Sequence, residues 1–125
     1  RQRQMCIRDS HNMLRAYISP SMGEHSIDGI FTSSDHLAMI VQEELEEMGK
    51  RVPEDIQIIG YDGLQFLNQG KPIVSSIAQP VHEIAKEAVR CLNELIANGK
   101  TEGNTKIPVS FQEGPTTKTL VTEEK

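Results

Sequence analysis

The sequence predicts an α/β fold, a parallel β-sheet flanked by helices, from three features of its 125 residues. Short apolar runs at residues 27–32, 56–61 and 73–77 have the length and composition of buried parallel strands. Apolar residues recur at helical spacing over residues 35–48 and 81–96. Because these strands and helices alternate, and the connections are long enough for crossovers, neighbouring strands are expected to run parallel.

The first strand, at residues 27–32, is expected to be parallel and buried because of its apolar run. A helix over residues 35–48 follows it, with Ser34 or Asp35 as its N-cap and Gly49 just after its end. The predicted apolar face of this helix consists of Leu37, Ile40, Val41, Leu45 and Met48. The acidic cluster is predicted to be a solvated face made by Glu43, Glu44, Glu46 and Glu47.

The same alternation continues through the second half of the chain. The predicted elements are a strand at residues 56–61, a short helical turn at 64–69 and a strand at 73–77. Pro80 suits the first position of a long helix, whose apolar stripe runs as far as Ile96. Residues 107–111 alternate as a last strand, and the Thr- and Lys-rich tail from Gly114 is expected to be loose.

The composition argues against several classes of protein. A formal net charge of −5 disfavours direct contact with nucleic acid, whose phosphates need a basic surface. No apolar run approaches the roughly 18 residues of a membrane-spanning helix, so no membrane contact is expected. Cys6 and Cys91 lie far apart in unlike contexts, which favours reduced thiols in a cytoplasmic protein. The histidines lack metal-ligand spacing, and we expect neither a metal nor a cofactor.

Residues 1–10 differ from the rest of the chain, because they are polar, basic and without a hydrophobic period. They also resemble the peptide obtained when sequencing-adaptor DNA is translated, so we predict a non-native or disordered leader. Residues 11–117 are predicted to form the folded unit, and residues 118–125 a flexible tail. A chain that starts with Arg1 and whose first domain-like element begins late is interpreted as a fragment.

Three polar residues follow three predicted strands at the point where each strand ends: Ser34, Asp62 and Gln79. Ligands of open α/β sheets bind at the carboxyl ends of the strands, so these side chains are candidate ligand contacts. A carboxylate that accepts hydroxyl hydrogens and an amide that both donates and accepts suit a neutral, hydroxyl-rich ligand. The alternative is that Asp62 is only a turn residue and Gln79 only a polar residue before a proline.

The helix at residues 35–48 has an apolar face wider than one sheet needs, because Ala38 and Met39 extend it sideways. Deeper packing is the simpler explanation, and a subunit contact through Met39 is the alternative, since methionine is favoured at interfaces. An α/β enzyme is a further possibility. The sequence contains no nucleophile elbow, P-loop or dinucleotide-binding glycine loop, so we predict no catalytic residues.

Four stretches together resemble the lactose/galactose-repressor (LacI/GalR) family of bacterial transcription regulators. They are Asp-Gly-Ile-Phe-Thr-Ser-Ser-Asp at residues 28–35, Val-Pro-Glu-Asp-Ile-Gln-Ile-Ile-Gly-Tyr-Asp at 52–62, Ser-Ile-Ala-Gln-Pro at 76–80, and Ile-Pro-Val-Ser-Phe at 107–111 with Thr116-Thr117. The matches run in the family's order and are most similar to regulators of sugar-utilisation operons, sucrose operons included.

The resemblance implies a periplasmic-binding-protein-like fold of type I, of which residues 11–117 would form the incomplete C-terminal lobe. Such regulators sense a sugar or sugar phosphate between two lobes, and bind operator DNA through an N-terminal helix-turn-helix that this chain lacks. The resemblance further implies effector contacts at Ser34, Asp62 and Gln79, a homodimer contact at Met39, and a cytoplasmic location. The helix after Gln79 would belong to the other lobe, so its apolar stripe would lack a partner.

A periplasmic sugar-binding protein of an ABC transporter is the main alternative within the same fold. Those proteins also carry a strand that ends in glycine, an aromatic residue, aspartate and glycine, as residues 60–63 do here. Against this alternative stand the Val-Pro-Glu-Asp turn, the Gln-Pro helix start and the C-terminal strand. The gene upstream distinguishes the two, because a regulator has a helix-turn-helix there and a transport receptor has a signal peptide.

Overall fold

The computed structural model describes residues 12, 15–16, 27–63, 67–68, 71–101 and 105–119, with the backbone alone at residues 67–68. Within these residues the main sheet has four strands in the order β1, β2, β5, β6. They are Gly29–Phe31, Gln57–Asp62, Ser75–Ala78 and Ser110–Gln112. The predicted leader at residues 1–10 and the end of the predicted tail, residues 120–125, lie outside the described residues.

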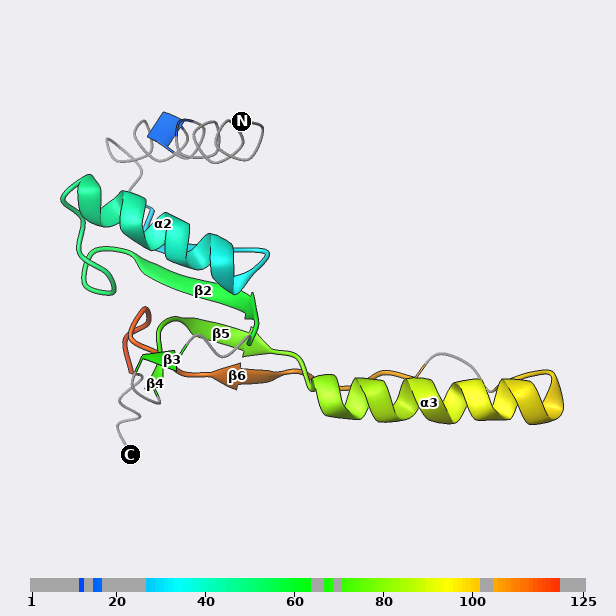
Figure 1. The fold of residues 1–125 in the computed structure, drawn as a ribbon. Helices are drawn as coiled ribbons and strands as arrows, with labels where there is room; N and C mark the ends of the chain where they lie inside the picture. Colours follow the sequence, from blue (N-terminus) through cyan, green and yellow to red (C-terminus); the bar gives the residue numbers. More distant parts are fainter. Residues whose placement is uncertain are drawn as a thin grey trace.

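The α/β fold class is confirmed, but the sheet is mixed where an all-parallel sheet was predicted. β1, β2 and β5 run parallel, whereas β6 is antiparallel to β5. The reason is visible in Figure 1. The chain leaves β5 at its carboxyl end through a long helix, returns alongside it, and therefore enters β6 from that same end.

The core lies between α2 (Asp35–Glu47) and the face of the sheet that α2 covers. Its buried residues are Ala38, Val41, Leu45, Ile56, Ile58 and Val74. Ala38 is fully buried at the centre of the helix face, although the pattern placed it at the side. Deeper packing therefore accounts for Ala38.

Glu44 corrects the prediction of a fully solvated acidic face on α2. Its side chain is 2% exposed, because it lies on the same helix face as Val41 and Leu45. Arg15, whose backbone is helical, places its guanidinium Nε 2.5 Å from Glu44 Oε2. An ion pair with a residue 29 positions away in the chain is not visible in the local pattern of α2.

β1 is one of the two edge strands of the sheet, and the prediction that it is buried is wrong. Ile30 packs against the core, but Phe31 on the opposite face is 65% exposed. Successive side chains of a strand point to opposite faces, and α2 covers only one of them. The ring of Phe31 instead meets Tyr61 of β2 edge to face, with 6.4 Å between the ring centroids.

A two-stranded hairpin, β3 (Leu67–Asn68) and β4 (Lys71–Pro72), precedes β5. The helical turn predicted for residues 64–69 is wrong at residues 67–68, and its other residues lie outside the described part of the chain. The pairing of β3 depends on residues 71–72, so a pattern read over residues 64–69 alone does not contain it.

α3 (Val81–Asn98) follows β5 and projects away from the sheet (Figure 1). Gly99, with φ 70°, ends it in the left-handed conformation that glycine tolerates best. None of the residues of α3 is buried, although its apolar stripe is regular. Among the described residues the stripe therefore has no partner that buries it, as the family resemblance implied, and Ile96 is 75% exposed.

The segment after β6 is held in the sheet by Thr116, so the prediction of a loose tail is wrong for residues 114–117. Thr116 is fully buried, and its hydroxyl donates to Ile58 O at 2.7 Å. The same hydroxyl accepts from Ser75 N at 2.8 Å, while Ile58 N donates to Thr116 O at 2.9 Å. Thr116 thus joins β2 to β5 near their amino ends. No helix among the described residues is long and apolar enough to cross a membrane.

Candidate ligand-binding site

Two of the three predicted site residues lie in direct contact at the carboxyl ends of neighbouring strands. Asp62 is the last residue of β2 and pairs in register with Ala78, the last residue of β5. Gln79 follows immediately, and its backbone N–H donates to Asp62 O at 3.1 Å. Its side-chain Nε2 donates to Asp62 Oδ1 at 2.7 Å. The fold therefore brings together a carboxylate and an amide that are 17 positions apart in the chain.

The backbone of Asp62 has a φ of 108°, which an L-residue with a side chain rarely adopts. Conformations of this kind cost about 1–3 kcal/mol and persist where the surroundings fix them. Gly63 helps to hold this backbone conformation in place, because its N–H donates to Ser76 Oγ at 3.1 Å. Gly63 also lies against Ala78 so closely that a methyl group at Gly63 would overlap Ala78.

Ser34 lies at the same edge of the sheet, after the end of β1. Its Oγ accepts a hydrogen bond from Leu37 N at 3.2 Å and so caps α2. Among the described residues no hydrogen bond joins the Ser34 side chain to Asp62 or Gln79. A hydroxyl that accepts one hydrogen bond retains its own O–H to donate, so the capping role and a ligand contact are compatible.

Beneath these side chains lies a buried polar pair that the sequence analysis missed. Asp35 is 1% exposed, and the buried hydroxyl of Ser76 donates to Asp35 Oδ1. A methyl group at Gly60 would overlap that oxygen, so only glycine leaves room for it. Glycine in the interior of a strand often marks the close approach of another group, and this was the available signal.

The arrangement offers hydrogen-bonding groups rather than metal-binding or nucleophilic chemistry. One Asp62 oxygen accepts from Gln79, and a carboxylate has further lone pairs for hydroxyl donors. The Gln79 amide can also accept through its oxygen. In the part of the chain that the structure describes, no group of three or more His, Cys, Asp or Glu side chains is placed to hold a metal ion.

Met39 is half-buried on α2, beside the core. It also lines a shallow surface cavity of about 350 Å³ together with His36, Ile40, Glu43 and Ile73, among others. Part of this side chain therefore packs inward, and part of it is available at the surface.

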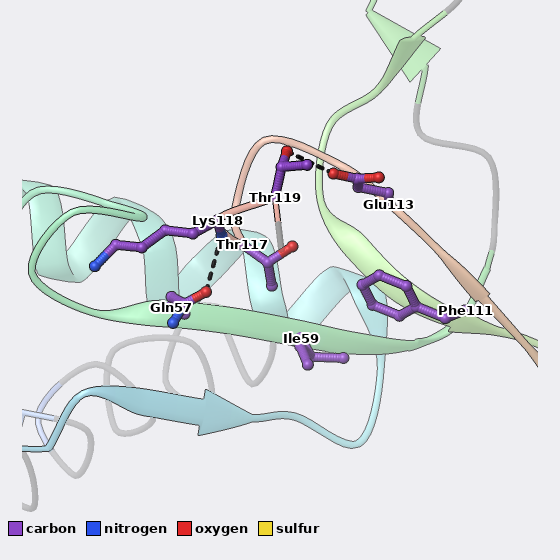
Figure 2. Close-up of a pocket in the computed structure, with 7 residues that line it drawn as sticks. All are labelled: Gln57, Ile59, Phe111, Glu113, Thr117, Lys118 and Thr119. Atoms are coloured by element: carbon purple, nitrogen blue, oxygen red, sulfur yellow. Dashed lines mark hydrogen bonds between the residues drawn. The ribbon is translucent and has the colours of Figure 1, made fainter. Parts of the chain in front are cut away.

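A second cavity, of about 410 Å³, lies at the other end of β2 (Figure 2). Ile59 and Phe111 give it an apolar lining, on the face of the sheet that α2 leaves open. Some of its polar groups bond to one another: Lys118 N donates to Gln57 Oε1 at 2.8 Å, and the Thr119 hydroxyl donates to the Glu113 carboxylate at 2.7 Å. None of the three predicted ligand contacts lines this cavity.

Comparison with known proteins identifies the fold and its relatives. Residues 2–117 match the family of periplasmic binding protein-like domains. The chain is 44% identical over 69 residues to the ribose operon repressor of Bacillus subtilis. This alignment covers 55% of this chain and 21% of that protein. It is 31% identical over 99 residues to the sucrose operon repressor of Pediococcus pentosaceus, covering 78% of this chain and 30% of the repressor.

Solved structures give the same result. A LacI family transcriptional regulator from Arthrobacter sp. FB24, in complex with lactose, superposes with a TM-score of 0.72 at 28% identity, over 87% of this chain and 40% of that one. A LacI family transcriptional regulator from Enterococcus faecium with bound ribose gives a TM-score of 0.67 at 29% identity, over 89% and 40%.

These matches confirm the resemblance to the lactose/galactose-repressor family that the sequence motifs indicated. The chain spans about a fifth to a third of the length of the curated relatives named above. Because the family match extends over most of its residues, the chain belongs to the family of periplasmic binding protein-like domains.

Proposed function

We propose that this chain supplies part of the sugar-sensing domain of a LacI-family transcription regulator. Residues 11–117 form that part, and Ser34, Asp62 and Gln79 contact a neutral sugar or a sugar phosphate. The observation that carries the proposal is the 2.7 Å hydrogen bond between Gln79 Nε2 and Asp62 Oδ1 at the carboxyl ends of β2 and β5. In open α/β sheets this edge is where ligands bind.

The chemistry of the pair suits a polyol better than an ionic ligand. A carboxylate makes stronger hydrogen bonds with hydroxyl donors than a neutral acceptor does, and an amide can satisfy either sense of a hydroxyl. Relatives solved with lactose and with ribose are consistent with this class of ligand. Neither a cofactor nor a catalytic step is part of the proposal.

The position of the pair supports a role in signalling. Gln79 is followed directly by Pro80 and by α3, whose apolar stripe is exposed. A sugar held by both Asp62 and Gln79 would restrict the direction in which α3 leaves the sheet. Such a restriction alters DNA binding only if the sugar has different affinities for the DNA-competent and DNA-incompetent states. The operator would be bound by a helix-turn-helix elsewhere in the same cytoplasmic protein.

The regulator and the transport receptor differ in what the gene encodes before this segment. Repressors among the relatives favour the regulator over a periplasmic sugar-binding protein. Reading the genomic DNA upstream of the codon for His11 tests this directly. We expect a helix-turn-helix and the rest of a sugar-sensing core. A signal peptide at that place would replace the regulator with a transport receptor.

We also propose that Met39 contributes to a homodimer contact, because its half-buried side chain lines a surface cavity on α2. Met39→Glu in the longest product of the gene should shift sedimentation toward the monomer, since a buried carboxylate at an interface is costly. Thr119→Glu adds the same charge at an exposed position and should leave the dimer intact. An intact Met39→Glu dimer would assign Met39 to the core alone.

A further inference from the structure

We propose that Asp35 and Ser76 form a buried positioning pair that holds the Asp62 carboxylate in place for the sugar. The inference deepens the proposed function and rests on it. Neither side chain contacts the sugar. Asp35 acts on Ser76, Ser76 acts on the backbone of Gly63, and Gly63 fixes the backbone of the residue before it.

The first step is the burial of a carboxylate that could otherwise have faced water. Asp35 is the first residue of α2, where the helix dipole favours negative charge, and it is 1% exposed. Gly60 of β2 has no side chain, and a methyl group there would overlap Asp35 Oδ1. The pairing of α2 with β2 is therefore built around this oxygen.

The second step is the hydroxyl of Ser76, which is 2% exposed and connects the carboxylate to the turn. Its Oγ donates to Asp35 Oδ1 and accepts from Gly63 N at 3.1 Å. A hydroxyl whose proton is committed to a carboxylate presents its lone pairs in a fixed direction, toward the Gly63 N–H. Asp35 thereby determines how Ser76 is oriented.

The third step concerns the backbone of Asp62, whose φ of 108° needs external support. Two hydrogen bonds bracket it: Gln79 N donates to Asp62 O, and Gly63 N donates to Ser76 Oγ. Without the second bond the turn can relax toward a more common φ, and the carboxylate then moves away from Gln79. Ligand affinity should therefore depend on Ser76 and Asp35, although neither contacts the sugar.

A stability effect alone has to be separated from a positioning effect, and Thr116 provides the matched control. Its hydroxyl joins the same two strands, β2 and β5, but near their amino ends. Thr116→Val should lower the melting temperature of the protein without disturbing the turn at Gly63. Ser110→Ala removes an exposed hydroxyl from β6, the neighbouring strand, and controls for the substitution itself.

The experiment is a calorimetric titration of D-ribose, sucrose, lactose and cellobiose, each in turn, into the full-length protein that the gene encodes. For the sugar that binds, Ser76→Ala should weaken the affinity by about tenfold, as expected when a positioning hydrogen bond to a charged partner is lost. Asp35→Asn, which keeps the shape of the side chain, should weaken it in the same direction by a smaller factor. Thr116→Val and Ser110→Ala should bind as the wild type does.

A second measurement reads the positioning step without any ligand. In the amide NMR spectrum of the 125-residue chain, the Gly63 resonance should shift and exchange faster with solvent in Ser76→Ala and Asp35→Asn, but not in Thr116→Val. Wild-type affinity and an unchanged Gly63 amide in both folded variants would overturn the positioning pair. A wild-type protein that binds none of the sugars would instead refute the proposed function, while the Gly63 resonance would still test the hydrogen-bond chain.

Discussion

Two parts of this chain have apolar surfaces of similar regularity, but only one of them is covered. In the first part, α2 lies on the sheet, and Leu45 and Ile58 are fully buried between them. In the second part, α3 carries a longer stripe with Leu92 and Ile96 exposed, and no residue of the helix is buried. Both helices are amphipathic, so the difference lies in the presence of a partner and not in the helix itself.

The comparison also locates the candidate site. Asp62 and Gln79 lie where the packed part ends, and α3 begins two residues after Gln79. A ligand bound at the proposed site would contact the sheet on one side and, on the other, the first turn of α3, none of whose residues is buried. Hinge motions in proteins are taken up by a few residues at the ends of helices and strands, and Gln79 and Pro80 occupy such a position between β5 and α3.

The largest expected effect is on the free energy of unfolding, when a leucine is truncated in the packed helix α2 and in the exposed helix α3. Leu45→Ala should lower the free energy of unfolding by about 3 kcal/mol, because it opens a cavity in a closely packed core. Leu92→Ala removes the same atoms from the 55%-exposed stripe of α3 and should change the free energy by less than about 0.5 kcal/mol. Urea unfolding followed by circular dichroism measures both. Equal losses would mean that α3 is packed in solution, and the contrast between the two parts would disappear.

A smaller effect on the free energy of unfolding is expected when the hydrogen bonds that hold the C-terminal segment against the sheet are removed. Thr116→Val should lower the free energy of unfolding by about 2 kcal/mol, because it leaves the buried Ser75 N–H and Ile58 C=O each without one partner. Thr119→Val, at an exposed position, should have almost no effect. If both substitutions gave the same urea midpoint, the segment after Gly114 would be as loose as its composition suggests.

The smallest effect concerns the charged side of α3. The side-chain hydrogen bond from Arg90, followed by that from Thr105, lowers the pKa of Glu87 from 4.5 to about 2. A pKa lowered by folding stabilises the folded form above pH 4.5, and the stabilisation disappears as the pH falls from 4.5 through 2. The helical Cα chemical shifts of α3 should therefore decrease as the pH falls over that range. The decrease should be slight, because solvent screens the ion pair of Glu87.

Glu87→Gln is the matched test of this dependence, because it removes the titrating group and keeps the shape. The variant should show a flatter change in the α3 chemical shifts between pH 4.5 and pH 2. Glu83→Gln, in the first turn of the same helix, should retain the wild-type dependence. A wild-type profile in Glu87→Gln would show that the Arg90 pair contributes nothing to α3.

The sequence predicted those features of the fold that depend on local periodicity. Both long helices were expected within one or two residues of their bounds, because a helix face repeats every few positions. The antiparallel direction of β6 and the burial of Thr116 were missed, because they depend on partners far away in the chain. Likewise, the ion pair of the buried Glu44 was missed, because its partner Arg15 lies 29 positions away in the chain.

In the candidate site, too, some residues were predicted from the sequence and others were not. Asp62 and Gln79 were expected together because each ends a parallel strand, and the carboxyl ends of such strands meet at one edge. The buried pair beneath them was not expected, because Asp35 has the same sequence signal as an ordinary residue of the first helical turn. The burial of Asp35, its hydrogen bond from Ser76 and its closeness to Gly60 show that the carboxylate points inward, and all three depend on residues far from Asp35 in the chain.

The most direct test is the response of operator binding to sugar in Asp62→Ala. Fluorescence anisotropy with the DNA upstream of the gene's own operon would be measured for the longest product of the gene, with and without the sugar that binds. We predict that Asp62→Ala binds the DNA like the wild type but no longer responds to the sugar, whereas Asp28→Ala, at the amino end of β1, responds normally. An unchanged response in Asp62→Ala would contradict the central claim that the sugar is sensed at the ends of β2 and β5.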